Sequence, residues 1–193
     1  MIKLTGEGQS GALPPSFAYA GKFDLAAHFI LPVTRYLRAV NTEKYIVPAQ
    51  RHLDIGCGDG YFLQRSRCEE RFGLDPLMGD KIEDRLDFPD DHFDYVTMLA
   101  VIEHIADPMP LLREIARILK PGGKWVATTP KYAADRLIRL YVRHVAEHEH
   151  EVYYDLESFK ALTEPLFEMV GHHTFIFGLN QVFCLKKHSN KDG

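Results

Sequence analysis

The chain has 193 residues, of which 46% are hydrophobic and 26% charged, and its formal net charge is −4 at pH 7. These values are typical of one globular domain, and the acidic balance argues against a general nucleic-acid-binding protein. No apolar run approaches the ~20 residues that span a bilayer, and the N-terminus does not resemble a secretory signal. The three cysteines, Cys57, Cys68 and Cys184, are too few for a disulfide framework, so we expect a reducing, cytoplasmic setting.

Residues 1–20 contain three glycines and two prolines and show no hydrophobic periodicity. This composition is typical of a loop, so we expect a flexible N-terminal segment. The alternative is that the segment folds over a bound ligand, which Phe17, Tyr19 and Lys22 would then contact.

A helix is expected to follow this segment. From Asp24, a candidate N-cap, apolar side chains recur through Val40 and predict an amphipathic helix. Pro32 should break or kink it, because proline lacks the amide hydrogen that a helix interior needs. We expect residues 21–188 to form a single domain, with 189–193 as a polar tail.

The most informative stretch is 52–60, His-Leu-Asp-Ile-Gly-Cys-Gly-Asp-Gly. Asp54 lies between two apolar residues, as in a short strand, and the residues after the stretch resemble a helix start. Glycines occupy every second position of the turn between them: Gly56, Gly58 and Gly60. Glycine can adopt φ > 0 and lets a ligand approach the backbone closely. A strand, a glycine turn and a helix together predict a nucleotide-binding crevice. The same residue pattern also fits a tight turn in any α/β protein.

The spacing of this turn indicates the kind of ligand. Dinucleotide folds use Gly-x-Gly-x-x-Gly, whereas here the third glycine comes one residue early. The carboxylate of Asp54 would repel a pyrophosphate and would suit an amine. Asp75, fifteen residues after Gly60, closes a short apolar stretch and stands where a ribose diol is held. The expected ligand has an amine and a ribose but no pyrophosphate, and Cys57 is interpreted as a small packing residue rather than a nucleophile.

The connection after Asp75 is short. Only 17 residues separate it from Phe93, and 77–87 is rich in charge. We therefore expect a single turn or a loop in place of a helix and a strand. Phe93 to Ala100 is apolar and predicts a buried central strand.

Another helix and strand are expected next. Asp107 followed by Pro108 predicts a helix start. The helix has apolar side chains at four-residue spacing and should end at Pro121-Gly122-Gly123. Residues 125–129 then predict a strand that Pro130 ends.

Residues 133–146 predict a further helix, with Arg136, Arg139 and Arg143 on one face. This face is either an ordinary solvated surface or a docking surface for an anionic group. His148 and His150 lie among acidic residues, but without a fourth ligand at a familiar spacing we assign no metal.

The C-terminal part predicts a helix and a hairpin. Asp155 is expected to cap a short helix through Leu162. Residues 167–177 and 181–187 predict two strands joined by a turn at 178–180.

Three blocks of this sequence resemble the class I S-adenosylmethionine-dependent methyltransferases. Residues 53–60, Leu-Asp-Ile-Gly-Cys-Gly-Asp-Gly, resemble the first motif of that family. Residues 88–96 and 101–104 resemble the approach to its fourth strand and the turn after it, and 119–123 the turn before its fifth strand. The resemblance implies an α/β fold, a three-layer Rossmann-like sandwich with a mostly parallel sheet and a C-terminal antiparallel hairpin.

The resemblance also implies S-adenosylmethionine as cofactor and assigns residues to its parts. The methionine amine and carboxylate would be held by the strand acid and the loop: Asp54, Gly56, Cys57, Gly58 and Gly60. Asp75 would hold the ribose. The adenine and methionine pockets would be lined by residues of two later turns: Leu77, Asp84 and Ala100.

For function we expect methyl transfer to a small-molecule acceptor, because the closest resemblance is to methyltransferases of the ubiquinone-biosynthesis type. His104 is the candidate base, and a packing or cofactor-contacting role is the alternative. Residues 131–154 are the expected substrate cover, with candidate acceptor contacts at Arg143, His148, His150 and Tyr153. The other hypotheses are a cofactor-binding module without catalysis and a methyltransferase acting on a macromolecule. The chain is expected to be a monomer or a homodimer.

Overall fold

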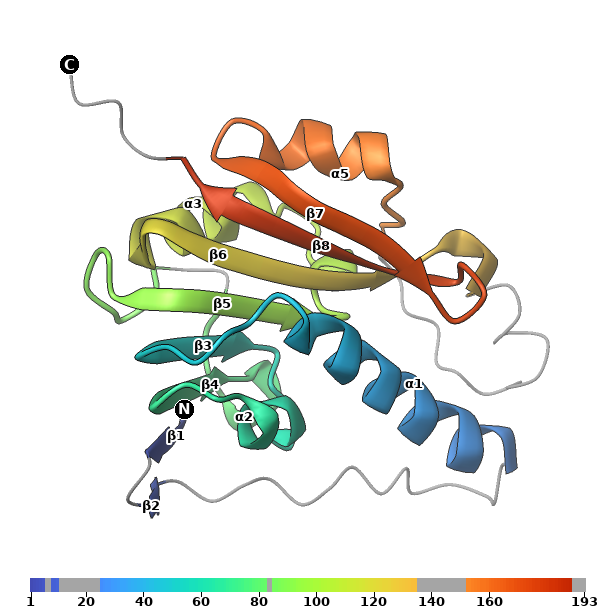
Figure 1. The fold of residues 1–193 in the computed structure, drawn as a ribbon, viewed down its shortest axis with the longest axis horizontal. Coiled ribbons are helices and arrows are strands. Elements are labelled where there is room, and N and C mark those ends of the chain that lie inside the picture. Colours follow the sequence, from blue (N-terminus) through green and yellow to red (C-terminus); the bar gives the residue numbers. More distant parts are fainter. Residues whose placement is uncertain (6–7, 11–24, 83–84, 135–151, 189–193) are drawn as a thin grey trace.

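The computed structural model describes residues 1–5, 8–10, 25–82, 85–134 and 152–188. In these parts of the chain an eight-stranded sheet has the order β2-β1-β4-β3-β5-β6-β8-β7. Helices pack on both faces of the sheet (Figure 1). The structure therefore confirms the predicted three-layer α/β sandwich.

Four parallel strands form the centre of the sheet: β3 (Arg51–Ile55), β4 (Glu70–Leu74), β5 (Phe93–Leu99) and β6 (Leu119–Pro130). β3 pairs with β4 on one side and with β5 on the other. The chain runs first to β4 and then back across β3 to β5, so the strand order reverses at β3. Ligands of such sheets bind at this switch point, outside the carboxyl ends of the strands.

The C-terminal hairpin is confirmed. β7 (Phe167–Phe175) and β8 (Asn180–Lys187) are antiparallel, and β8 also runs antiparallel to β6. The β7–β8 turn therefore lies at the carboxyl end of β6, on the same edge as the glycine turn.

One face of the sheet carries α1 (Leu25–Glu43) and the short α2 (Tyr61–Arg65). Ala39 of α1 and Phe62 of α2 are buried in one cluster with Val126 of β6. Of the two predicted effects of Pro32, a break is wrong, since α1 runs through this residue, whereas a kink stays a prediction. Pro32 itself is exposed, so its ring lies outside the core.

The opposite face carries α3 (Met109–Ile118) and α5 (Leu156–Thr163), and the larger cluster of core side chains lies beneath them. The Asp155 cap of α5 is confirmed as a capping box shared with Ser158. α3 ends at Ile118, before the predicted Pro-Gly-Gly stop, because the buried Leu119 already pairs with Phe93 in the sheet.

The N-terminal segment differs from its loop prediction. β1 (Ile2–Thr5) and β2 (Gly8–Ser10) are strands, and β1 pairs antiparallel with β4. Ile2 and Leu4 are buried while their neighbours are partly exposed, an alternation too short to notice in a glycine-rich segment. The shortened crossover is confirmed, because η1 (Pro76–Met78) is a single 3₁₀ turn.

The described helices are all too short or too polar to cross a membrane.

Candidate functional site

The glycine turn joins β3 to α2 at the switch point. Gly56, Gly58 and Gly60 have φ values of 73°, 54° and 74°, all in the left-handed region that favours glycine. A Cβ on Gly56 would lie 2.2 Å from Cγ2 of Val101, so this glycine lets the turn after β5 pack against the loop. A Cβ on Gly58 would meet no atom within 4 Å. The loop is therefore packed from behind at Gly56 and open at Gly58.

Two buried aspartates flank this loop. Asp75, at the end of β4, accepts hydrogen bonds from the backbone amides of Gly58 (2.7 Å) and Leu77 (2.9 Å). Asp54 of β3 accepts one from the Thr97 hydroxyl of β5 (2.6 Å). Burial raises the pKa of Asp54 to about 7; the Thr97 hydrogen bond opposes this rise and the nearby Asp75 adds to it. The structure thus brings together the two acids that the sequence analysis assigned to an amine and a ribose.

Cys57 packs beneath the loop with Ile2, Leu4 and Leu63. Burial, together with neighbouring carboxylates of which Asp54 is the strongest, raises the pKa of its thiol well above the usual range. A thiol kept protonated in an apolar cluster fits the predicted packing role.

The turn after β5 forms the adjoining wall. Ala100 has φ = 60°, uncommon for a residue with a side chain, and its amide bonds to the carbonyl of Thr128 (2.8 Å). η2 (Ile102–His104) follows, in which Glu103 is buried and His104 is exposed. The candidate base is therefore at the carboxyl edge and accessible from solvent.

Both ends of the predicted substrate cover are attached to this same edge. At its start, the Lys131 amide bonds to the carbonyl of Leu179 in the β7–β8 turn (2.8 Å). At its end, the Val152 amide bonds to the carbonyl of Glu103 (2.9 Å). The rings of Tyr132 and Tyr153 meet edge to face with centroids 5.4 Å apart, which joins the two ends to each other.

α1 is tied to the glycine loop by Arg35. Its guanidinium forms an ion pair with Asp59 and lies over the ring of Tyr61, 4.2 Å from the centroid. The helix that follows the N-terminal segment is thus in direct contact with the loop.

Some candidate residues cannot be placed. Asp84, Arg143, His148 and His150 lie outside the described residues, as do Arg136 and Arg139 of the expected basic helix. Leu77 is described: 74% of its surface is exposed, and its amide donates to the carboxylate of Asp75.

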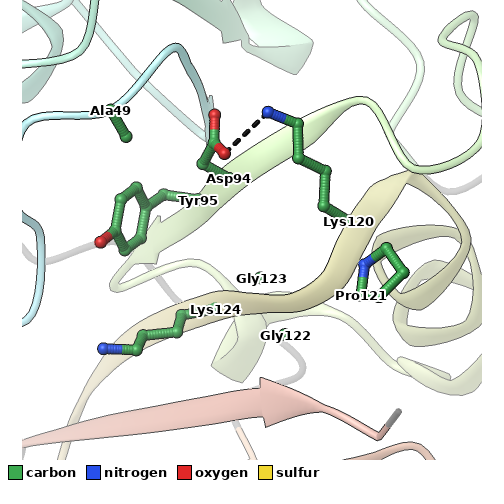
Figure 2. Close-up of a pocket in the computed structure, with 8 residues that line it drawn as sticks. All are labelled: Ala49, Asp94, Tyr95, Lys120, Pro121, Gly122, Gly123 and Lys124. Carbon is green, nitrogen blue, oxygen red and sulfur yellow. Dashed lines mark hydrogen bonds and ion pairs between the residues drawn. The ribbon is translucent and has the colours of Figure 1, made fainter.

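A separate cavity of about 200 Å³ lies at the opposite edge of the sheet, by the amino ends of β5 and β6. Figure 2 shows Lys120 and Asp94 side by side in its wall, joined by a 2.7 Å ion pair. It is smaller than typical ligand sites of ~300–1,000 Å³. Its main charges are paired with each other, so the carboxyl edge remains the better candidate.

Sequence reasoning missed the polar residues that support Asp54. His52 and Thr97 are both fully buried, and each was interpreted only as part of a strand. The available signal was a histidine in a strand otherwise expected to be apolar. Arg35 was also missed, because nothing nearby in the sequence indicates its contact with Asp59.

A glycine turn at a switch point between two buried acids is typical of nucleoside-binding α/β domains. The profile of a methyltransferase domain family matches residues 26–165, most of the chain, so the chain belongs to this family. It is a member of the class I S-adenosylmethionine-dependent methyltransferases, and S-adenosylmethionine is its cofactor.

Individual relatives support this placement. The ubiquinone/menaquinone biosynthesis C-methyltransferase of Shewanella oneidensis is 38% identical over 80 residues, which cover 40% of this chain and 26% of that protein. The match thus spans about a quarter of the relative's length.

Two solved structures share the fold. A methyltransferase in complex with a Haloferax volcanii methyltransferase activator has a TM-score of 0.68 at 16% identity, covering 88% of this chain and 96% of that one. A Thermotoga maritima S-adenosylmethionine-dependent methyltransferase has a TM-score of 0.62 at 19% identity, covering 84% and 98%.

The described residues fit this cofactor. The open space at Gly58 leaves the loop backbone accessible, and Asp54 and Asp75 provide acceptors for an amine and a ribose on either side of it.

Proposed function

We propose that this chain transfers a methyl group from S-adenosylmethionine to a small-molecule acceptor at the carboxyl edge of the sheet. The observation that carries the proposal is the open glycine loop at the switch point, with one buried aspartate on each side. The cofactor supplies a methyl group made electrophilic by its sulfonium. The protein then has chiefly to position an acceptor, which can account for ~7–11 kcal/mol of the barrier.

The roles of the cofactor-binding residues follow from their positions. Asp54 faces the amine, the open backbone at Gly58 faces the methionine carboxylate, and Asp75 faces the ribose. Leu77 covers the adenine. Asp84 lies outside the described residues and is assigned to the adenine edge from the sequence alone. The left-handed backbone at Ala100 lets the β5 turn approach the methionine part closely.

The acceptor is placed beneath residues 131–154. Support comes from the two attachments of this segment, to Leu179 and to Glu103, which place both its ends at the edge where the cofactor binds. The segment concentrates Arg143, His148 and His150, whose cationic groups favour an acceptor bearing carboxylate or phosphate. Tyr153, at its base, is the aromatic contact.

His104 is proposed as the base when the acceptor is a weak acid such as a hydroxyl. It is the last residue of η2, the turn after β5, and its side chain is exposed at the carboxyl edge. An acceptor with a ready nucleophile would not need it.

The test is a screen of small acceptors with methyl-labelled cofactor, run on the wild-type chain and on Asp75→Asn. The substitution keeps the shape but places an amide group against the donors of Gly58 and Leu77. Cofactor affinity should fall by ~1.5–3 kcal/mol, the scale of hydrogen bonds to a charged group. Asp87→Asn, which removes the same charge at an exposed site, is the matched control and should bind normally.

The outcomes separate the proposed function from its alternatives. Cofactor binding without turnover of any acceptor would indicate a binding module. Turnover confined to protein or RNA would indicate a macromolecular acceptor. Normal affinity in Asp75→Asn would show that the ribose is held elsewhere.

A further inference from the structure

A continuous line of buried polar groups leads from the end of α2 to Asp54. The Cys68 amide donates to the Ser66 hydroxyl (3.5 Å), which lies 2.9 Å from Nδ1 of His52. Nε2 of His52 lies 2.8 Å from the Thr97 hydroxyl, which donates to Oδ1 of Asp54 (2.6 Å). We refer to Ser66, His52, Thr97 and Asp54 as the polar chain.

The direction of these hydrogen bonds follows from the chemistry of each group. An ionised Asp54 can only accept, so the single hydroxyl hydrogen of Thr97 is committed to it. Thr97 must then accept from Nε2–H of His52, which leaves Nδ1 as an acceptor for the Ser66 hydroxyl. Every donor in the polar chain therefore points toward the Asp54 carboxylate.

His52 is well suited to remain in this tautomer. It is fully buried, and its ring meets Phe62 of α2 edge to face at 5.7 Å. Burial, with a further contribution from the positive charge of Arg71, lowers the pKa of His52 to about 3, so the ring stays neutral. A neutral ring has one donor and one acceptor, and both are used here.

Other titratable groups also act on Asp54. The carboxylate of Asp75 at the end of β4 opposes its ionisation, and the Cys57 thiol of the glycine loop lies nearby. Arg71 of β4 is directed to the α2 end of the polar chain, with Nη1 3.4 Å from the carbonyl of Leu63 and 3.3 Å from that of Ser66. Thr97 provides the hydrogen bond that favours the charged form of Asp54.

We infer that His52 and Thr97 are positioning residues that hold the Asp54 carboxylate in the orientation and charge state that binds the cofactor amine. This inference rests on the proposed function, in which Asp54 faces that amine. Neither residue contacts the cofactor. Their effect is to set the pH range over which the cofactor binds.

The experiment measures the affinity for S-adenosylhomocysteine, which keeps the amine, by calorimetry from pH 6 to pH 8.5. Wild-type affinity should increase with pH through the ionisation of Asp54. Thr97→Val, which removes only the hydroxyl, should move the midpoint up by about one pH unit, roughly a tenfold loss below the midpoint and little loss at pH 8.5. Thr97→Ser, which keeps the hydroxyl, should behave like the wild type.

A second pair of variants tests His52 without removing its polarity. The side-chain amide nitrogen of His52→Gln can occupy the place of Nε2 and donate to Thr97, so its midpoint should be that of the wild type. In His52→Asn the amide falls near Nδ1 and cannot reach Thr97, so its midpoint should move up, but by less than in Thr97→Val, because the Thr97 hydroxyl remains and has lost only the group that orients it. NMR titration of the Asp54 carboxyl carbon in the same variants reads the charge state directly, without ligand.

Two results would overturn the inference and leave the polar chain a structural element. One is a loss of affinity in Thr97→Val that is equal at every pH; the other is an equal midpoint in His52→Gln and His52→Asn. Absence of S-adenosylhomocysteine binding by the wild type at any pH would instead refute the proposed function.

Discussion

Gly56 and Gly58 offer a direct test of how the glycine loop divides packing from ligand binding. Gly56→Ala places a Cβ 2.2 Å from Cγ2 of Val101, while Gly58→Ala places one in open space. Both positions have positive φ, which costs an alanine ~1–2 kcal/mol. Overlap in a packed region adds ~1–3 kcal/mol, and only at Gly56.

Urea unfolding should therefore show that Gly56→Ala lowers the free energy of unfolding by ~2–5 kcal/mol and Gly58→Ala by ~1–2 kcal/mol. Cofactor affinity, measured by calorimetry on the folded variants, should be lower for Gly58→Ala, because its methyl group occupies the space that the ligand needs.

A compensating substitution isolates the overlap. Val101→Ala removes both γ-methyl groups and leaves only Cβ, 3.2 Å from the new methyl. The double variant Gly56→Ala, Val101→Ala should show a favourable coupling energy of ~1–3 kcal/mol relative to the two single variants. Equal stability of Gly56→Ala and Gly58→Ala, or no coupling with Val101, would refute the assignment of Gly56 to packing and Gly58 to the ligand.

Three further predictions concern other parts of the molecule. Because the pKa of its thiol is raised, Cys57 should resist iodoacetamide at pH 8 in the folded protein and react after unfolding. Site-resolved mass spectrometry can follow this labelling. Rapid labelling of the folded protein would contradict the packing role. Asp155→Ala should lower the urea midpoint by removing the capping box of α5, whereas Asp155→Asn, also a good N-cap, should largely preserve it. Since His52 is held neutral in the fold with its pKa lowered to about 3, the unfolded chain binds the extra proton below the ordinary value of 6.5. This contribution destabilises the fold as the pH falls from about 6.5 toward 3, while Asp54, whose pKa is raised to about 7, acts in the opposite sense over much of the same range. The measurement is therefore the difference in stability between His52→Gln and the wild type, which should shift in favour of the variant as the pH falls through this window.

The elements that could be predicted from the sequence are those specified by neighbouring residues. The strand, glycine turn and helix around Gly58 are encoded between Arg51 and Arg65, and the Asp155 cap within four positions. The C-terminal hairpin is similarly local. In each case the backbone conformation is specified by the side chains of the same few residues that adopt it.

The polar chain could not be predicted, because it depends on the register between two strands that are far apart in sequence. Asp54 of β3 stands directly opposite Thr97 of β5, while His52 stands opposite Tyr95 and reaches Thr97 diagonally. A shift of one residue would turn these side chains to the other face of the sheet. Single-sequence patterns indicate that each strand exists but do not determine this register.

The N-terminal strand is best understood together with the shortened crossover. With only η1 between β4 and β5, the described chain places no parallel strand beside β4, and an uncovered edge would expose unpaired backbone groups. β1 closes this edge by antiparallel pairing, with Ile2 opposite Gly73 and Leu4 opposite Arg71. The same two apolar side chains pack with Cys57 beneath the glycine loop. The described part of a segment with loop composition thus extends the sheet and packs beneath the glycine loop, because the neighbouring strand edge supplies the pairing that its own sequence does not specify.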